Sequence, residues 1–310
     1  MTSLIKRRRV EGVEEHLPRT ISNSEASAFT QCQRKHYYGF LRKLEPNETG
    51  QALSRGIIGH EAMEAYYRGL MEGKPVQECR DAAINIVSAY LQQGYADTAM
   101  LADLINLLTR YFRYYDHTEW EILGVETAYE IPVNDDWYFG MRLDLLVRLA
   151  DKTVVLVDHK FVYDFYSDTV LEMNAQMPKY LGTLRFNGIR AEYGILNQIR
   201  YRLKKGGNED SELFKRARIT PNNHEVRTYM GEQFEISERI MERRELSPEE
   251  QSRKAVRTAN QMVCKNCSFE PLCKSEAMGG DIALMVSQDY KANAYVERQN
   301  PSETVLGEIE

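Results

Sequence analysis

The segments GMRLDLLV at residues 140–147 and VVLVDHKF at residues 154–161 decide the fold of this chain. Each is a short apolar run that contains β-branched or similar large residues, which is the pattern of a buried strand. The polar residues between them predict a tight connection, so the two strands should pair antiparallel around Asp151. In that register Asp144 lies directly opposite Asp158 on one face of the sheet.

This pair of acids within apolar strands requires a neutralising partner. Two carboxylates that face each other repel, and an unpaired buried carboxylate is costly or shifts its pKa. A divalent cation with oxygen ligands, Mg²⁺ or Mn²⁺, removes the repulsion. Lys160 on the same face can orient a metal-bound water or offset developing charge. The alternative is a set of ordinary ion pairs, of Asp144 with Arg142 or Arg148 and of Asp158 with Lys160.

The remaining pattern predicts an α+β fold with a helical N-terminal region. Apolar residues recur at three- and four-residue spacing before residue 116 and after residue 222, whereas residues 121–162 form short β-rich pieces that indicate a meander. Ser22 and Ser24 are good N-caps for the first helix. The predicted helices are 22–40, 57–71, 76–93, 97–116, 167–186, 222–246 and 248–261, with a strand pair at 193–203 and an exposed excursion at 204–221.

The composition excludes several classes of protein. The chain has 310 residues, of which 43% are hydrophobic, and this is enough for a large core and unlike a small disulfide scaffold. Its 40 basic and 46 acidic side chains give a net charge of -6, which argues against a polybasic coat. The apolar runs are far too short to span a bilayer. We therefore expect an intracellular protein without membrane contact.

The order of the acids and the lysine resembles the PD-(D/E)XK nuclease superfamily, in which one strand ends in Asp and the next carries Asp-x-Lys or Glu-x-Lys. Asp144 and the segment Asp158-His159-Lys160 match this pattern. Asp158 stands where many relatives have Glu, and its shorter side chain could alter the metal spacing. The resemblance extends from about residue 22 to 275. It implies a restriction-endonuclease-like core, which is a small mixed central sheet with flanking helices.

Two further motifs resemble those of RecB-type nucleases. Gln176 and Tyr180 match a Q-x-x-x-Y motif, for which the resemblance implies contacts to DNA or to the catalytic centre. Pro178 between them would kink the helix or mark its start. The segment GHEAME from Gly59 resembles the upstream histidine motif. Apart from the resemblance, Gln176 is equally typical of a solvated residue, Tyr180 of a core aromatic and His60 of an exposed histidine.

The resemblance also implies the roles of the site residues. A neutral imidazole among carboxylates favours Mn²⁺ somewhat over an all-oxygen site for Mg²⁺. Glu126 occupies a position where related nucleases often carry an acid, and a surface glutamate is equally consistent with the sequence. The implied catalytic residues are Asp144, Asp158, Lys160, Gln176 and Tyr180, and the implied metal ligands are His60, Asp144, Asp158, the backbone carbonyl of His159 and, as a secondary candidate, Glu126.

The cysteines form a second candidate site. Cys264, Cys267 and Cys273 are spaced C-x2-C-x5-C, which favours metal binding over a secreted disulfide framework. Cys32 is the best fourth ligand, because its position before basic and aromatic residues resembles the first ligand of AddB-type and CRISPR-associated RecB-like iron–sulfur nucleases. The resemblance implies a structural [4Fe–4S] cluster, with zinc or no metal as the alternatives. Cys79 has no place in this arrangement and is predicted to be a free thiol.

These features divide the chain into a nuclease core and flanking segments. The expected divisions are a mobile arm at 1–20, a helical region with the first cysteine and the histidine motif at 21–120, the PD-(D/E)XK core at 121–205, an insertion and C-terminal helices at 206–262, the cysteine segment packed with Cys32 at 263–280, and a tail at 290–310. A cluster that joins Cys32 to the cysteine segment would clamp both arms around the core.

Basic residues with aromatic neighbours predict a channel for single-stranded DNA, with a modest and salt-sensitive affinity because the chain is acidic overall. Runs of this kind are also typical of solvated faces. The cations are Arg34, Lys35, Arg42, Lys43, Arg200, Arg202, Lys204, Lys205, Lys215, Arg216 and Arg218, and the aromatics are Tyr37, Tyr38, Phe40, Tyr201 and Phe214.

The sequence therefore predicts a metal-dependent DNA exonuclease that threads a single-stranded end into its site. One alternative is a non-catalytic DNA-binding subunit of a recombination, repair or CRISPR-adaptation complex. Another is a nuclease subunit that works only with a helicase, and since the chain has no G-x-x-x-x-G-K-[ST] segment, the motor would come from a partner. The resemblance suggests the cytoplasm of a prokaryote or of a phage-infected cell.

Overall fold

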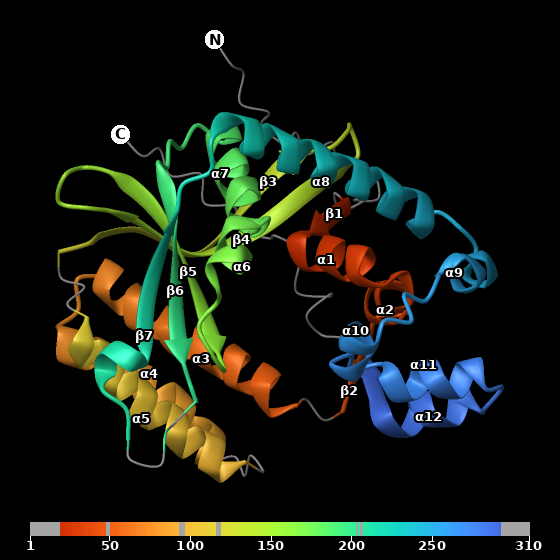
Figure 1. The fold of residues 1–310 in the computed structure, drawn as a ribbon, viewed down its shortest axis with the longest axis horizontal. Helices are drawn as coiled ribbons and strands as arrows, with labels where there is room; N and C mark the ends of the chain where they lie inside the picture. The colour runs from red at the N-terminus through yellow and green to blue at the C-terminus, as the bar shows by residue number, and fades with distance from the viewer. Residues whose placement is uncertain are drawn as a thin grey trace, which may run out of the picture.

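The structure, a computed structural model, describes residues 19–47, 50–92, 97–115, 119–202, 204 and 207–292. It has the predicted α+β fold, with a mixed central sheet flanked by helices (Figure 1). Residues 1–18 of the predicted arm, Lys205 of the predicted channel and residues 293–310 of the predicted tail lie outside the described residues. Within the described ranges, no helix combines the length and the apolar character needed to cross a membrane.

The predicted meander forms the middle of the sheet, which has six strands in the described part of the chain. β3 pairs antiparallel along nearly all of β4, so parallel β1 and antiparallel β5 share the opposite edge of β4. β6 runs parallel to β5, and β7 is antiparallel to β6. The strands are β1 (Arg19–Ser22), β3 (Glu121–Pro132), β4 (Trp137–Arg148), β5 (Val154–Val162), β6 (Tyr193–Arg200) and β7 (Phe214–Ile219).

The last strands of the sheet differ from the prediction. The predicted strand pair at 193–203 is the single strand β6, and the predicted exposed excursion contains β7 together with a 3₁₀ turn (Asp210–Glu212). In β7 the side chains of Phe214 and Ala217 are buried, whereas Lys215 and Arg218 are exposed. These exposed charges on an edge strand give the segment its loop-like composition.

The pairing of β4 with β5 has the predicted register. Leu145 lies opposite Val157 and Arg148 lies opposite Val154, so Asp144 and Asp158 are the next opposed positions. β1 pairs with β4 only at residues 137–140. Among the described strands, that edge of β4 therefore has no ladder partner at residues 141–144, and the two acids lie where the sheet opens.

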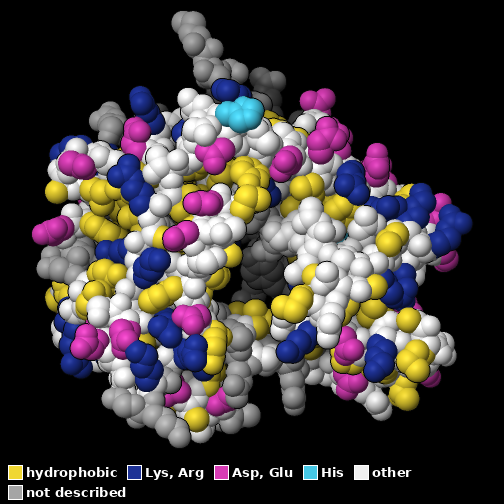
Figure 2. All heavy atoms as spheres, in the orientation of Figure 1, with side chains coloured by type: hydrophobic (Ala, Val, Ile, Leu, Met, Phe, Trp, Pro, Cys, Tyr) yellow, Lys and Arg dark blue, Asp and Glu magenta, His cyan; other side chains and the backbone are white. Residues whose placement is uncertain are grey.

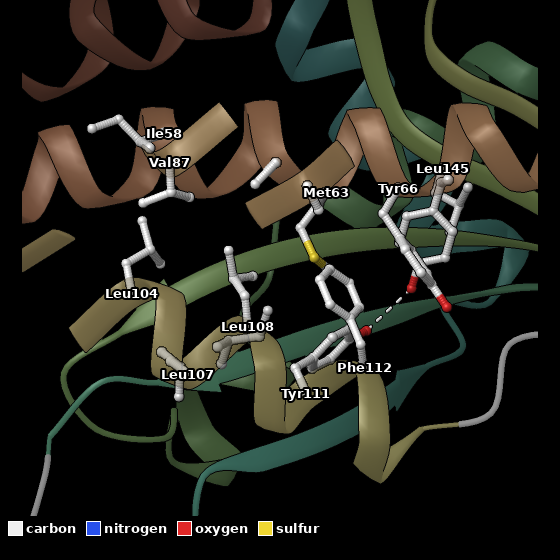
Figure 3. Packing of buried hydrophobic residues seen from close by; sticks show 14 of the residues in the cluster. Ile58, Met63, Tyr66, Val87, Leu104, Leu107, Leu108, Tyr111, Phe112 and Leu145 are labelled. Atoms are coloured by element: carbon white, nitrogen blue, oxygen red, sulfur yellow. Dashed lines mark hydrogen bonds between the residues drawn. The ribbon is translucent and has the colours of Figure 1, made fainter. Parts of the chain in front are cut away.

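Helices cover both faces of the sheet (Figure 1). On one face, apolar side chains of three helices meet each other and Leu145 of β4, and the Tyr67 and Tyr111 hydroxyls lie 3.2 Å apart within this core (Figure 3). On the other face, Leu181 and Leu184 pack against the sheet. The first layer is α3 (Gln51–Met71), α4 (Val76–Gln92) and α5 (Thr98–Tyr114), and the second is α7 (Gln176–Phe186) with α8 (Asn223–Arg244).

Two of the predicted helices are each divided in two in the structure. The helix expected at 167–186 splits into α6 (Asp168–Glu172) and α7, because Asn174 Oδ1 accepts the N–H groups of Gln176 and Met177 at 3.1 and 2.9 Å. Pro178 then lies in the first turn of α7, where it interrupts no helical hydrogen bond.

The helix expected at 22–40 is interrupted at Cys32, whose backbone is extended. It is replaced by α1 (Asn23–Gln31), α2 (Gln33–His36) and a π-helical turn (Tyr37–Leu41). Ser22 caps α1 as predicted, since its Oγ accepts the N–H of Glu25 at 3.1 Å. The break directs Cys32 toward the segment that follows α9 (Pro248–Lys254), where its Sγ lies 4.0 Å from the carbonyl oxygen of Val256.

The C-terminal segment packs on the N-terminal helices. β8 (Tyr290–Ala292) pairs with β2 (Leu44–Pro46), so residues 290–292 form a strand rather than part of the predicted tail, and Arg19 and Thr20 likewise belong to β1 rather than to the predicted arm. The helices here are α10 (Gln261–Lys265), α11 (Glu270–Ala277) and α12 (Ile282–Asp289). Figure 2 shows a hollow between this part of the molecule and the sheet with its helices.

Candidate active site

The two predicted acids lie close together at the opening of the sheet. The N–H of His159 donates to Asp144 Oδ2 at 2.7 Å and so ties that carboxylate to β5. Asp158 is 1% exposed. Leu143 and Leu145, which would share a face of a regular strand, pack in different apolar clusters. β4 therefore changes face at Asp144, and its carboxylate leaves the regular ladder.

Two further predicted residues contact the carboxylate of Asp158, and a third contacts one of these two. Lys160 Nζ lies 2.9 and 2.7 Å from its two oxygens. Gln176 Nε2 donates to Oδ1 at 3.1 Å and also to the hydroxyl of Tyr180. The ion-pair alternative is thus realised for Asp158 and Lys160, while Arg148 pairs with Glu121 at 2.6 Å instead of Asp144.

His60 reaches the site from α3. Its Nδ1 lies 3.5 Å from Asp144 Oδ2, and its ring centroid lies 6.0 Å from that of Phe161. The preceding glycine permits this approach, because a Cβ at Gly59 would lie 2.4 Å from the Phe161 ring. Any larger residue would push α3 away from β5. The glycine and the histidine of the motif therefore act together.

Glu126 also enters the site. Val125 and Thr127 on either side of it lie opposite Leu145 and Leu143, so Glu126 faces Asp144 across the ladder. Its φ of 49° is in the left-handed region, which few residues other than glycine adopt without strain. One ligand atom each from His60, Glu126 and Asp144 lies within 4.8 Å of the others. The secondary candidate from the sequence is thus placed beside two of the primary ones.

The electrostatics of this site favour a bound cation. Burial, together with the charge of Asp158, raises the pKa of Asp144 to about 6. Burial and the charge of Asp144 raise the pKa of Glu126 to about 8. Burial by itself would lower the pKa of Lys160, but the charges of Asp158 and Asp144 outweigh it, so its pKa is raised. Burial is thus the main cause of both raised carboxyl pKa values, and the charge of a neighbouring carboxylate adds to it.

The side chains present fit a divalent metal ion. Carboxylate oxygens are the ligands preferred by Mg²⁺ and Mn²⁺, and an imidazole is compatible with Mn²⁺. The cluster of His60, Glu126 and Asp144 supplies both kinds of donor within one ligand sphere. A cation there would offset the mutual repulsion that adds to burial in raising the two carboxyl pKa values.

A buried polar network behind the site is not indicated by the sequence motifs. Asn197 of β6 donates from its Nδ2 to His159 Nδ1 at 2.8 Å and to the hydroxyl of Tyr111 at 2.9 Å. An amide nitrogen only donates, so His159 accepts this hydrogen bond through Nδ1. Its ring also stacks on Tyr67 at 5.4 Å. Asn197 thus fixes the residue whose N–H binds Asp144, and only its position beside His159 in the β5–β6 register reveals this.

The predicted cysteine ligands come together from the two ends of the described chain. Cys32 follows α1, and the other three lie in or between α10 and α11. Charges on Cys32 and Cys273 both act on Cys267, although burial is the main reason why its pKa is raised. Cys79 is instead buried on α4 within the large core, as expected for a free thiol.

Polar groups surround two of the four thiols. Burial alone would raise the pKa of Cys32, but hydrogen bonds from Thr258, Lys35 and Arg34 lower it below the usual value. Arg257 Nε donates to Cys273 Sγ at 3.3 Å. Donors of this kind stabilise a thiolate, which is the form that binds metals.

Several of the predicted DNA-binding residues are buried or contact other parts of the protein. Tyr38 and Phe214 are 0% and 3% exposed, so the expectation that they stack on bases is wrong in this structure. Arg34 is buried and pairs with Glu276 at 3.2 Å. Arg216 is sandwiched between Tyr115 and Trp120, with its guanidinium 3.5 and 4.4 Å from the ring centroids.

Two of the other candidates, Tyr201 and Arg202, lie near the elements that carry the acid site. Tyr201 and Arg202 follow β6 and contact the residues after β5 and on α3. These two are therefore better placed than Tyr38 or Phe214 to meet a nucleic acid at the site.

The chain matches the family described as the PD-(D/E)XK nuclease superfamily over residues 20–274. This range contains all the predicted ligands and catalytic residues, from Cys32 to Cys273. The chain therefore belongs to the PD-(D/E)XK nuclease superfamily, in agreement with its mixed central sheet and flanking helices.

Two of the solved structures that match the chain are similar to it over most of its length. SSO0001 is 18% identical, with 85% of this chain and 88% of that protein covered and a TM-score of 0.39. A protein from Eubacterium rectale, described as "Putative exonuclease", is 12% identical, with 84% and 94% covered and a TM-score of 0.47. No curated protein sequence matches.

Proposed function

We propose that this protein is a metal-dependent deoxyribonuclease that removes nucleotides from single-stranded DNA ends and carries a structural [4Fe–4S] cluster. The observation that supports the activity best is the convergence of His60, Asp144, Asp158 and Lys160 at the opening of the sheet. Membership of the superfamily supports nuclease chemistry. The RecB-like motifs at Gln176 and Tyr180 favour action on DNA ends.

A Mn²⁺ or Mg²⁺ ion held by His60, Glu126, Asp144, Asp158 and the backbone carbonyl of His159 would supply Lewis acidity and a coordinated water of lowered pKa. The protein keeps its donors ready for that ion through fixed hydrogen bonds. The His159 N–H orients Asp144, and Gln176 orients Asp158. Tyr180 holds Gln176 in turn.

Lys160 acts as a cation rather than as a general base. Its raised pKa keeps the ammonium protonated at neutral pH, because Asp158 and Asp144 lie beside it. A protonated lysine can donate a hydrogen bond to the attacking water or to a phosphate oxygen, and it offsets the negative charge that develops on the phosphate.

The proposed cluster has a structural role. Cys32 and Cys264 are 232 positions apart in the sequence, so a ligand group that joins them closes a long loop, and the entropy of loop closure grows with length. Contacts between Tyr38 and Phe269 and between β2 and β8 hold the same two segments together. The cluster would complete a clamp between the chain ends without taking part in redox chemistry.

A nuclease assay tests this proposal. Full-length protein purified without oxygen is incubated with 5′- or 3′-labelled single-stranded DNA in Mn²⁺, Mg²⁺ or EDTA. We expect stepwise shortening from one end with either metal and none in EDTA, and we expect Asp158→Ala to be inactive while its visible spectrum matches the wild type. Full activity in EDTA or in Asp158→Ala would contradict the proposal. An inactive, folded, coloured wild type would instead indicate a subunit that depends on a partner such as a helicase.

A further inference from the structure

Large apolar side chains face solvent next to the acid site. Leu53 and Ile57 of α3 are 51% and 46% exposed, and Tyr163, directly after β5, is 58% exposed. Leu53, Ile57 and His60 follow one another at four- and three-residue spacing, so they form one stripe along α3. A contiguous exposed patch of such side chains is typical of an interaction site, whereas single exposed apolar residues are not.

The stripe and the tyrosine lie on the same side of the site because α3 and β5 run past each other in opposite directions. Tyr67 stacks on His159, and Gly59 packs on Phe161. Residues later in β5 therefore lie nearer the start of α3, so Tyr163, two residues after Phe161, lies toward the first turns of α3. Arg55 of those turns lies over Tyr201, whose ring is 5.9 Å from that of Tyr163.

Arginines border these rings. The guanidinium of Arg55 lies 4.1 Å from the Tyr201 centroid, and that of Arg202 lies 5.3 Å from the Tyr163 centroid. Asp164 pairs with both Arg200 and Arg202, at 3.3 and 3.2 Å, so one positive charge is in excess there. Arg55 makes no ion pair with any described residue. The surface is thus both aromatic and positively charged.

We propose that Leu53, Ile57, Tyr163, Tyr201, Arg55 and Arg202 form a stacking surface for unpaired bases of the strand whose phosphate lies at the acid site. Apolar and aromatic side chains that face bases beside arginines that face phosphates are the combination that binds single strands without sequence preference. This proposal rests on the proposed nuclease function and names the form of its substrate. A protein partner would also cover apolar surface, but the excess of positive charge and the adjoining acid site favour a nucleic acid.

The length of the stripe sets how many nucleotides it contacts. Leu53 and His60 are seven residues apart, which is about 10 Å along a helix at about 1.5 Å per residue. A stacked strand advances about 3.4 Å per nucleotide. The surface therefore contacts about three nucleotides next to the cleaved bond. A base pair hides the base faces within its stack, so duplex DNA cannot make these contacts until it is opened.

The first turns of α3, which carry Leu53, Arg55 and Ile57, lie next to the hollow of Figure 2. In Figure 1 the first turns of α3 extend beyond the sheet, beneath the space between the core and the C-terminal helices. Hydrophobic side chains are visible at the lower margin of the hollow in Figure 2. A single strand that enters there would pass the stripe before it reaches His60.

Binding measurements on full-length protein test the surface separately from catalysis. In a Lys160→Met background, fluorescence anisotropy gives the Kd for a labelled 12-nucleotide single strand and for the blunt duplex of the same sequence, in Mg²⁺. We expect the single strand to bind at least about tenfold more tightly. Tyr163→Ser and Ile57→Ser should each weaken single-strand binding about five- to fifty-fold, as loss of a stacking contact does. Phe186→Ser, which removes another exposed aromatic, 63% exposed on α7, is the matched control and should not.

A base analogue locates the contacts. 2-Aminopurine loses fluorescence when it stacks, so we expect quenching at about three successive positions near the bound end, and recovery in Tyr163→Ser. Equal affinity for the blunt duplex, or single-strand affinity unchanged in both variants, would overturn the proposed surface. Failure of the wild type to cleave DNA with any metal would instead overturn its proposed nuclease activity in the absence of a partner, while the binding results would still decide the surface.

Discussion

The acid site takes its residues from β3, β4, β5, α3 and α7, which pack together through the two large apolar clusters. The cysteine site joins short helices from the two ends of the chain through a small cluster around Tyr38 and Phe269. In the acid site each carboxylate of the central pair already has a protein partner, the His159 N–H for Asp144 and Lys160 for Asp158. The thiols of the cysteine site lie at partly exposed turns and helix ends.

This difference indicates that a metal at the acid site would serve activity, whereas a metal at the cysteine site would serve structure. The fold positions the acids before an ion arrives, so removal of the ion should cost activity more than structure. The cysteine segment has few buried apolar residues of its own, so its order should depend on what the thiols bind. The following predictions test this contrast.

Replacement of Lys160 should have the largest effect. Lys160→Met removes the cation beside both acids and should lower cleavage by about 100-fold or more, as loss of a group that stabilises transition-state charge does. Lys179→Met is the control, because Lys179 is also partly buried but donates to Gln233 at 2.9 Å, away from the acids. Single-turnover rates on labelled DNA should fall only in the first variant. Equal losses in both would show that general destabilisation is the cause.

Replacement of Cys32 should affect structure strongly. Cys32→Ser should abolish the visible absorbance of the purified protein, lower Tm by roughly 5 °C or more and expose the chain ends to limited proteolysis. Cys79→Ser should keep the absorbance, because Cys79 lies on α4 in the large core. A colourless but stably folded wild type would contradict the iron–sulfur cluster. Loss of colour without faster proteolysis would contradict the clamp.

Replacement of Asn197 should weaken metal binding with a smaller effect on the fold. Asn197→Leu leaves His159 without its amide donor and should lower Mn²⁺ affinity about tenfold, as loss of a group that orients ligands usually does. Gln233→Leu is the matched control, since Gln233 is an equally buried amide on α8. Titration by electron paramagnetic resonance measures the affinity. The same Kd in both variants would assign Asn197 a purely structural role.

The Tm of the metal-free protein should fall as pH rises, and we expect this effect to be the smallest of the four. Glu126 has a folded pKa of about 8 against an ordinary 4.5, and Asp144 about 6 against 3.8. Between these values the folded acid is protonated and the unfolded acid is ionised, so unfolding releases protons. In EDTA, Tm should therefore drop by roughly 2–4 °C between pH 5 and pH 8.

Glu126→Gln isolates this effect. The variant should lose most of the decrease above pH 6, where Asp144 no longer contributes. Differential scanning calorimetry in EDTA measures it. The same slope in the variant and the wild type would show that Glu126 titrates normally. Addition of Mn²⁺ at pH 8 should raise the Tm of the wild type more than that of the variant, since the ion binds the ionised carboxylate.

The sequence predicts the central hairpin well because its information is local. An apolar run predicts a buried strand. The short polar connection at Asp151 fixes the register that places Asp144 and Asp158 opposite each other. The sequence does not predict β7, because this edge strand exposes Lys215 and Arg218 and its polar composition resembles that of a loop. The stacking residues Tyr38 and Phe214 are likewise misplaced, because burial is a property of the whole chain.

The sequence by itself determined the class of this protein, the pairing of its two strand acids and the cysteines that could share a ligand, because these follow from spacing along the chain. Only the tertiary structure decided that Glu126 faces Asp144, that Asn197 supports His159 and that an exposed stripe on α3 continues from His60. Each of these depends on how separate elements approach, and that approach is set by packing, such as the contact of Gly59 with Phe161, rather than by any local motif.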